Sequence, residues 1–301
     1  MDSRGGRQAG LPSHERQFYA QSRAFGRFGM RQFRPVVMGT AHWHGHIELN
    51  LIRGAGLIYD FNGQPVEVPA GHGVCFWAGV PHQLVGVARA GDARPLLSNI
   101  YLPVDCFLLM PFIGRLQVAL LAGAIVAMPA DVLTAAAVDR WYADYRSGDF
   151  ERAEVVKMEL NAAFRRLLLD PLAYLVAPRI DLDEERGLSS AQVRHVVEMV
   201  RFILENLDCP LRNADIAGVT GLNENYAIGL FSRIMHTAPR QFLARMRLMR
   251  ARALLVESSM AIPSVAEASG FSSISQFYHR FREAYGVSPG ELRDRYVRME
   301  L

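Results

Sequence analysis

One pattern occurs twice in the last hundred residues of this 301-residue chain, and it limits the possible folds more than any other feature. In each copy an alanine is followed four residues later by a glycine and then by a large apolar residue, and further on a phenylalanine precedes a proline by eight residues. Corresponding positions lie 49 or 50 residues apart: Ala217 and Ala266, Gly221 and Gly270, Phe231 and Phe281, Pro239 and Pro289. Chance rarely produces such agreement, so the pattern predicts two copies of one small structural unit.

Each copy meets the requirements of a helix-turn-helix. The alanine leaves room where the second helix crosses the first, and the glycine tolerates the left-handed backbone of a tight turn. Asn223 is the expected N-cap of one second helix, and Ser272 or Ser273 of the other. A connecting helix from Pro239 to Glu257 would be about 28 Å long, close to the ~34 Å between successive major-groove faces of B-DNA. We therefore expect a reader of double-stranded DNA; the alternative is a helical bundle that binds no nucleic acid.

The charge distribution is compatible with DNA binding but does not establish it. Residues 190–301 hold 14 arginines against 11 acidic side chains, which accounts for the whole formal net charge of +3. A surplus of this size is a weak signal for a nucleic-acid partner by itself.

Three stretches of the C-terminal part carry a resemblance to a known family. They are YAIGLFSRIM (226–235), ARALLVES (251–258) and VAEASGFSSISQFYHRFREAYGVSPGELR (265–293). On these motifs, residues 190–297 resemble the AraC/XylS family of transcription activators, which implies RNA polymerase as a partner. His236 departs from the family pattern, which has a turn glycine there. Histidine tolerates left-handed backbone, so we expect local strain and an intact fold.

The same resemblance implies which residues meet DNA. Side chains near the start of each second helix reach base edges in the major groove. The implied base-contacting residues are Asn225, Ile228, Gly229, Ser275, Gln276 and His279. Arg233 and Arg280 are expected at phosphates.

The N-terminal half contains two histidine motifs. In HWHGHIELNLIRG (42–54), every second residue would face one side of a β-strand. That side would carry His42, His44, His46 and Glu48. The second segment, PAGHGVCFWAGVPHQL (69–84), contains the motif G-x5-W-x-G-x2-H from Gly71 to His82. Together they resemble the two cupin motifs, with tryptophan in place of a proline, and imply a small β-barrel with a pocket at its mouth. The expected effector-pocket residues are His42, Trp43, His44, Glu48, Trp77 and His82.

Three interpretations of these polar residues remain open. Imidazole and carboxylate ligands suit Fe, Mn, Ni or Zn, so a divalent transition metal would be bound by His42, His44, Glu48 and His82. Alternatively they hydrogen-bond a small polar effector, or they form a polar network without a ligand. The corresponding proteins are a ligand-sensing regulator, a metal-dependent cupin enzyme with a DNA-binding tail, and a DNA-binding protein whose barrel only dimerises.

A resemblance within the AraC/XylS family indicates the chemical class of the effector. HWHGHIELN and FWAGVPHQL in the expected barrel, and LNENYAIGLFSRIM in the first reading helix, resemble a sugar-responsive regulator. This implies an α-galactoside or related sugar as effector, and a non-enzymatic activator of a carbohydrate-use operon. Trp43 and Trp77 would then stack on a pyranose ring; the alternative is that both belong to the barrel core.

The expected fold is α+β, with an N-terminal cupin-like β-barrel and helical pair followed by an all-α domain of two helix-turn-helix units joined by a long helix. We expect a loose N-terminus at 1–15, an effector-sensing and dimerisation domain at 16–180, a linker at 181–189 and a DNA-binding domain at 190–301. The helical pair is expected within 131–170. Its second helix has an apolar stripe and additional apolar residues beside it, which predict a homodimer; the alternative is that the stripe packs on the barrel of its own chain. The stripe is Val156, Leu160, Ala163, Phe164 and Leu167, and the residues beside it are Val155, Met158 and Leu168.

Cysteine and apolar content indicate the compartment. Cys75, Cys106 and Cys209 are widely spaced and form no CxxC pair, which argues against a disulfide framework and a structural zinc site. The most apolar stretch, Leu116–Met128, is shorter than the roughly 20 residues of a membrane-spanning helix. A cytoplasmic protein without a membrane segment is therefore expected.

Overall fold

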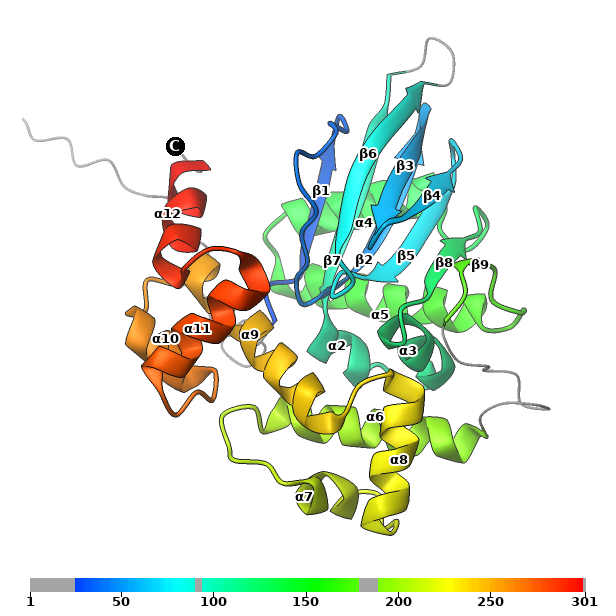
Figure 1. Ribbon diagram of the computed structural model, residues 1–301. Coiled ribbons are helices and arrows are strands. Elements are labelled where there is room, and N and C mark those ends of the chain that lie inside the picture. Colours follow the sequence, from blue (N-terminus) through cyan, green and yellow to red (C-terminus); the bar gives the residue numbers. More distant parts are fainter. Residues whose placement is uncertain (1–24, 90–93, 179–188, 300–301) are drawn as a thin grey trace, which may run out of the picture.

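The computed structural model describes residues 25–89, 94–178 and 189–299. Strands dominate its first part and helices make up the rest, so a sheet domain is followed by a helical domain (Figure 1). The predicted loose N-terminus, 1–15, and residues 181–188 of the predicted linker lie outside the described residues.

The sheet domain contains two antiparallel sheets. The first, in spatial order, is β1 (Gly29–Phe33), β7 (Leu96–Pro103), β2 (His46–Arg53), β5 (Gly73–Trp77), β8 (Ile125–Met128) and β9 (Tyr174–Val176). The second is β4 (Gln64–Val68), β3 (Ala55–Phe61) and β6 (His82–Arg89). Among the described residues no strand pairing joins the two sheets, so the predicted barrel is not closed. Gly54, with a left-handed φ of 71°, lies between β2 of the first sheet and β3 of the second.

The central strand β2 is buried on both faces. Ile47, Leu49 and Leu51 belong to a core shared with the helices behind the first sheet. Glu48 and Asn50 alternate with them and are also buried, so they point toward the opposite side of the strand. The pleat of β2 therefore directs its apolar side chains toward the helices and its polar side chains toward the space between the two sheets.

Four helices accompany the sheets and pack on the first one. They are α2 (Val104–Leu109), α3 (Gly114–Leu121), α4 (Ala135–Arg146) and α5 (Phe150–Leu167). The apolar stripe of α5 is buried in this core: Val156, Leu160, Ala163, Phe164 and Leu167 are all 5% exposed or less. Beside it, Val155 and Met158 are exposed as expected, at 46% and 70%. Leu168 instead is partly buried against the core, because it caps α5 where the helix ends.

The helical domain repeats one arrangement twice. Its helices are α6 (Ser190–Glu205), α7 (Asn213–Gly218), α8 (Glu224–Met235), α9 (Pro239–Glu257), α10 (Ile262–Ala268), α11 (Ile274–Tyr285) and α12 (Pro289–Met299). The expected N-caps of α8 and α11 are present, since Asn223 accepts from the Asn225 amide and Ser273 from the Gln276 amide. His236 ends α8 with a left-handed φ of 49°, as its position in the pattern predicts.

The two turn glycines offer a paired test of the fold. Both have left-handed backbone, with φ of 67° at Gly221 and 82° at Gly270. A Cβ at Gly221 would meet nothing within 4 Å, whereas one at Gly270 would lie 2.1 Å from the Leu207 carbonyl oxygen. We expect Gly221→Ala to lower the free energy of unfolding by about 1 kcal/mol and Gly270→Ala by about 3 kcal/mol or more. Urea unfolding followed by circular dichroism measures both, and equal losses would contradict the crowded turn.

Candidate functional site

The residues expected at DNA lie on the outer faces of α8 and α11. Asn225, Gly229 and Arg233 are exposed and spaced four residues apart, so they follow one face of α8; Ile228 is half-buried beside them. On α11 the four expected residues are all exposed: Ser275, Gln276, His279 and Arg280. Each helix therefore presents a mostly polar face to solvent while its opposite face is in the core.

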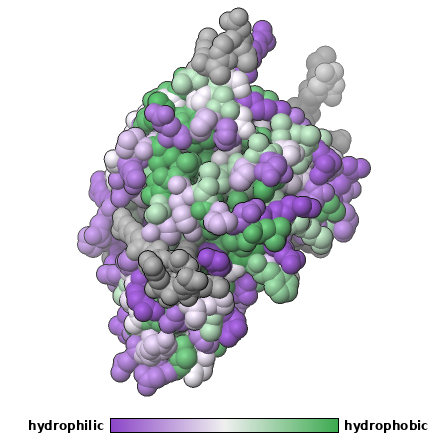
Figure 2. Space-filling model, turned by 90° about the vertical axis from the view of Figure 1, so that its right-hand side faces the viewer, coloured by the Kyte–Doolittle hydropathy of each residue, from purple (hydrophilic) through white to green (hydrophobic). Residues whose placement is uncertain are grey.

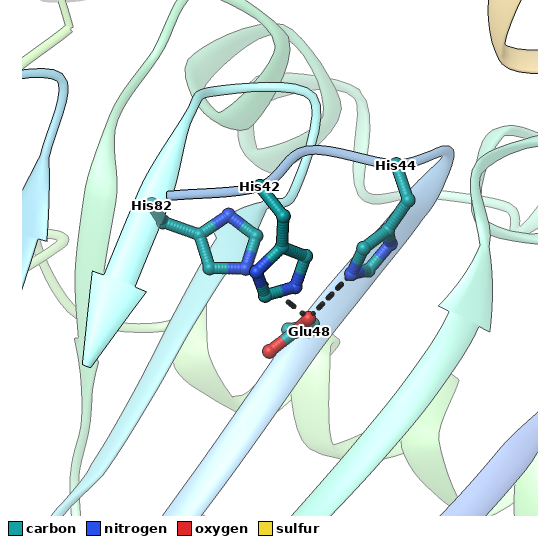
Figure 3. A group of neighbouring side chains, drawn as sticks. All are labelled: His42, His44, Glu48 and His82. Carbon is teal, nitrogen blue, oxygen red and sulfur yellow. Dashed lines mark ion pairs between the residues drawn. The ribbon is translucent and has the colours of Figure 1, made fainter. Parts of the chain in front are cut away.

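The second site is a cluster of three histidines and one glutamate in the sheet domain. The cluster consists of His42, His44, Glu48 and His82 (Figure 3). One ligand atom from each residue lies within 4.8 Å of the others. His42 and His44 precede β2, Glu48 is on β2, and His82 begins β6. Two backbone hydrogen bonds of 3.0 Å between His42 and His82 bring these segments together.

Glu48 is the centre of the cluster and is buried. Its Oε1 lies 2.8 Å from His44 Nε2 and 3.5 Å from His82 Nε2. Its Oε2 accepts a hydrogen bond of 3.0 Å from the Asn50 side chain, which also donates to the Tyr59 hydroxyl. One carboxylate oxygen is thus held by the protein, and the other faces the histidines.

His46 lies next to the cluster and does not join it. Sequence alternation placed it on the same side as His44, but β2 begins only at His46, so strand alternation does not extend to the preceding residues. Its Nε2 donates to the Arg27 carbonyl oxygen at 3.0 Å, and its Nδ1 lies 3.0 Å from His44 Nδ1. His46 therefore orients the His44 ring through the ring nitrogen that does not face Glu48.

Burial determines the charges of the cluster. It lowers the pKa of His42 and His44 to about 3 and that of His46 to about 4, so these imidazoles are neutral at pH 7. Burial raises the pKa of Glu48, but its contacts with His44 and His82 outweigh this and hold that pKa well below its usual range. A charged carboxylate consequently faces the neutral imidazole of His44.

The rim of the histidine cluster, formed by Trp43, Trp77 and Gly79, contacts helices α9 and α11 of the helical domain. Trp43 stacks on Tyr285 of α11, with ring centroids 4.3 Å apart and an interplanar angle of 12°. The Arg245 guanidinium of α9 lies 5.6 Å from the Trp43 ring and 4.9 Å from the Trp77 ring, and it donates to the Gly79 carbonyl. Both tryptophans expected in the effector pocket are therefore covered: Trp77 is buried, and Trp43 is engaged by the helical domain.

A second link joins the cluster to the end of α9. The Arg27 carbonyl oxygen accepts a hydrogen bond from His46. The Arg27 backbone amide donates to Glu257 at 3.3 Å, and the Arg27 side chain forms an ion pair with Glu257 at 3.5 Å. No sequence pattern indicated the four residues of these contacts: Arg27, Arg245, Glu257 and Tyr285. No local signal distinguishes Arg245 from the other arginines of α9, because only the packing of the two domains places it at the rim.

Comparison with known proteins identifies the family. A helix-turn-helix domain family matches residues 216–295, which contain α8, α10 and α11. The Melibiose operon regulatory protein of Escherichia coli (strain K12) is 30% identical over 264 residues, 87% of this chain and 86% of that protein. A match of that extent includes both domains. The chain belongs to the AraC family of transcription regulators.

Two further comparisons match part of the chain or its fold. The HTH-type transcriptional regulator GbdR of Pseudomonas aeruginosa is 29% identical over 115 residues, 38% of this chain and 30% of that protein. The crystal structure of ToxT from Vibrio cholerae O395 has the same overall fold, with a TM-score of 0.52 and 14% identity across 88% of this chain and 96% of ToxT.

The family establishes the general class of activity. The relatives are named as regulators, so this protein is a DNA-binding transcription regulator and not an enzyme, and the cupin-enzyme alternative is set aside. None of the helices in the described ranges has the length and apolar content that a membrane crossing requires.

Proposed function

We propose that this AraC-family regulator activates a carbohydrate-use operon in response to an α-galactoside or related sugar bound at the histidine cluster. The observation that carries the proposal is the contact between the rim of that cluster and the helices that bind DNA. Trp43 and Gly79 on the sheet domain contact Tyr285 and Arg245 on the helical domain. A ligand that displaces these contacts changes the freedom of α9 and α11, which links ligand binding to DNA binding.

The sugar class is inferred from similarity and from the chemistry of the pocket. The similarity to the Melibiose operon regulatory protein runs through 87% of this chain, so it includes the sheet domain as well as the helical one. Histidines 42 and 44 and Glu48 offer hydrogen-bonding groups for hydroxyls, and Trp43 offers an aromatic face once Tyr285 leaves it.

On the DNA side, we propose the contacts that the family resemblance implies. Base edges would be read by Asn225, Ile228, Gly229, Ser275, Gln276 and His279, and phosphates would be bound by Arg233 and Arg280. All of them except the half-buried Ile228 are exposed on α8 and α11, which supports this assignment. RNA polymerase is the partner expected of an activator.

Response to sugar is the decisive experiment. In a reporter strain with a promoter that the protein binds, we expect melibiose or raffinose to raise transcription about tenfold, a coupling of about 1.4 kcal/mol. His44→Gln and His82→Gln should abolish the response, whereas His72→Gln, at an exposed turn away from the cluster, should retain it. If no α-galactoside alters transcription or the melting temperature of the purified protein, the sheet domain serves only another role, such as dimerisation.

We also propose that the protein forms a homodimer through the outer face of α5. Val155 and Met158 are exposed there, one helical turn apart. The sheet domain leaves more apolar surface uncovered on the side where β8 and β9 lie (Figure 2). Because Leu160 is buried in the core of its own chain, substituting it would test folding. Met158→Asp should instead give a folded monomer in analytical ultracentrifugation at tens of micromolar, on the order where weak dimers form. A wild-type protein that is already monomeric would contradict this interface.

A further inference from the structure

The hydrogen bonds around the histidine cluster determine where its ring nitrogens present lone pairs. His46 Nε2 faces the Arg27 carbonyl, which only accepts, so that nitrogen carries the proton and Nδ1 of the neutral ring accepts. Its neighbour at 3.0 Å, His44 Nδ1, must therefore donate. A neutral His44 then has no proton left on Nε2, the atom 2.8 Å from Glu48 Oε1.

His82 also donates its Nδ1 proton to another group, so that its Nε2 faces Glu48. Its Nδ1 lies 3.0 Å from the Val80 carbonyl oxygen and donates to it. Its Nε2 is buried, lacks a hydrogen-bond partner in the described part of the chain and lies 3.5 Å from Glu48 Oε1. In these tautomers neither ring donates to Glu48, so a positive charge, carried by protons or by a metal ion, must lie between the carboxylate and the two ring nitrogens.

A single proton does not resolve this arrangement. A proton between His44 and Glu48 would satisfy that contact at 2.8 Å but would leave His82 Nε2 buried and unsatisfied. An unpaired buried nitrogen costs about 1–3 kcal/mol. A divalent cation accepts all the lone pairs at once.

The spacing of the donors fits such an ion. Metal–nitrogen and metal–oxygen bonds are about 2.1 Å long, which places adjacent ligand atoms about 3.0–3.5 Å apart and opposite ones about 4.2 Å apart. The observed 3.5 Å separation corresponds to adjacent ligands, and the 2.8 Å separation would have to widen by about 0.2 Å to do so. The widest separation of 4.8 Å requires closing by only about 0.6 Å to reach the opposite-ligand distance.

The surroundings also resemble those of a metal centre. Ligating histidines usually donate their second ring nitrogen to a carbonyl or another acceptor, as His82 does to Val80 and His44 does to His46. Ligating carboxylates are likewise held by a second group, here Asn50 on Glu48 Oε2.

We propose that the sheet domain binds one divalent transition-metal ion through the ring nitrogens of His42, His44 and His82 and the carboxylate of Glu48. Three imidazoles and a carboxylate select Fe, Mn, Ni, Co or Zn over Mg or Ca. Trp43 lies between His42 and His44 in the chain and stacks on Tyr285 of α11, so an ion held by these histidines would also order the segment that contacts α11. This inference does not depend on the proposed sugar response; with the ion bound, the ring nitrogens and Glu48 are its ligands, and sugar hydroxyls would bind beside it and not to these atoms.

The test is metal content and coordination of the full-length, untagged protein. Inductively coupled plasma mass spectrometry should find about one equivalent of transition metal per chain after growth in supplemented medium. After removal by EDTA, Co²⁺ titration should saturate at one equivalent with a visible absorption band, and X-ray absorption should count three imidazoles. Less than a tenth of an equivalent, with no saturable Co²⁺ binding, would overturn the proposal.

Three variants assign the site. Glu48→Gln should weaken Co²⁺ binding at least about 100-fold, and His46→Leu, which cannot accept from His44, by about 10–100-fold. His72→Gln is the matched control and should bind normally. Stoichiometric binding that survives Glu48→Gln would place the metal elsewhere and overturn the assignment. If Glu48→Gln does not fold, as shown by circular dichroism, the imidazole count of the wild-type protein decides. Because no DNA or sugar is present, a negative result leaves the proposed function standing.

Discussion

Affinity for duplex DNA is expected to fall about a thousandfold between 50 and 200 mM salt, if roughly six phosphates are neutralised. Each phosphate contact releases condensed counterions, so the logarithm of the binding constant falls linearly with the logarithm of the salt concentration. Arg233 on α8 and Arg280 on α11 are the exposed candidates for such contacts. Fluorescence anisotropy with a labelled duplex measures the slope for the full-length protein.

Variants separate phosphate contacts from base contacts. Arg233→Ala and Arg280→Ala should each weaken binding on all sequences alike and reduce the salt slope by about 1. Gln276→Ala or His279→Ala should instead relax the preference at one or two base pairs, at about 1–3 kcal/mol, and leave the slope unchanged. A salt-independent affinity, or equal weakening on every sequence in the Gln276 and His279 variants, would contradict the assigned roles.

Trp43→Ala is expected to raise the affinity of the ligand-free protein for its DNA site about tenfold. The substitution removes the stacking on Tyr285 and the contact with Arg245. An aromatic pair contributes about 0.5–1.5 kcal/mol and a cation–π contact about 0.5–2 kcal/mol. If the arrangement in this structure competes with DNA binding, losing about 1.4 kcal/mol of it raises the fraction of binding-competent molecules tenfold.

The position of Trp43 makes this prediction specific. Trp43 belongs to the sheet domain and carries no charge, so its removal takes nothing from the DNA-contacting surface. Tyr174→Ala is a matched control, since Tyr174 is an exposed aromatic residue on β9 of the same domain. An unchanged or lower affinity in Trp43→Ala would show that the contact does not restrain the reading helices.

Much of the helical domain was predictable because its signals are local. The turns at Gly221 and Gly270 require left-handed backbone, and both glycines adopt it. The caps Asn223 and Ser273 and the left-handed His236 follow equally from short-range geometry. Such features depend on neighbours within a few residues, so a single sequence contains enough information to locate them.

The histidine cluster was predictable in membership but not in arrangement. Motif spacing brought His42, His44, Glu48 and His82 together, and the structure places their ligand atoms side by side. Motif spacing did not predict that His46 contacts His44 Nδ1 and stays outside the cluster. This placement depends on β2 starting at His46 and on the Arg27 carbonyl, 19 residues away in the chain.

From the sequence alone came the two helix-turn-helix units, the capped helices and the residues of the polar cluster. Only the tertiary structure showed that the sheets do not close into a barrel and that the α5 stripe packs within its own chain. It alone also showed that Arg245 and Tyr285 cover the rim of the cluster. The physical reason is the separation in sequence between the residues that interact. Turns, caps and strand alternation are determined by interactions between near neighbours, whereas sheet closure and domain contacts join residues far apart in the chain, and their pairing leaves no periodic pattern in it.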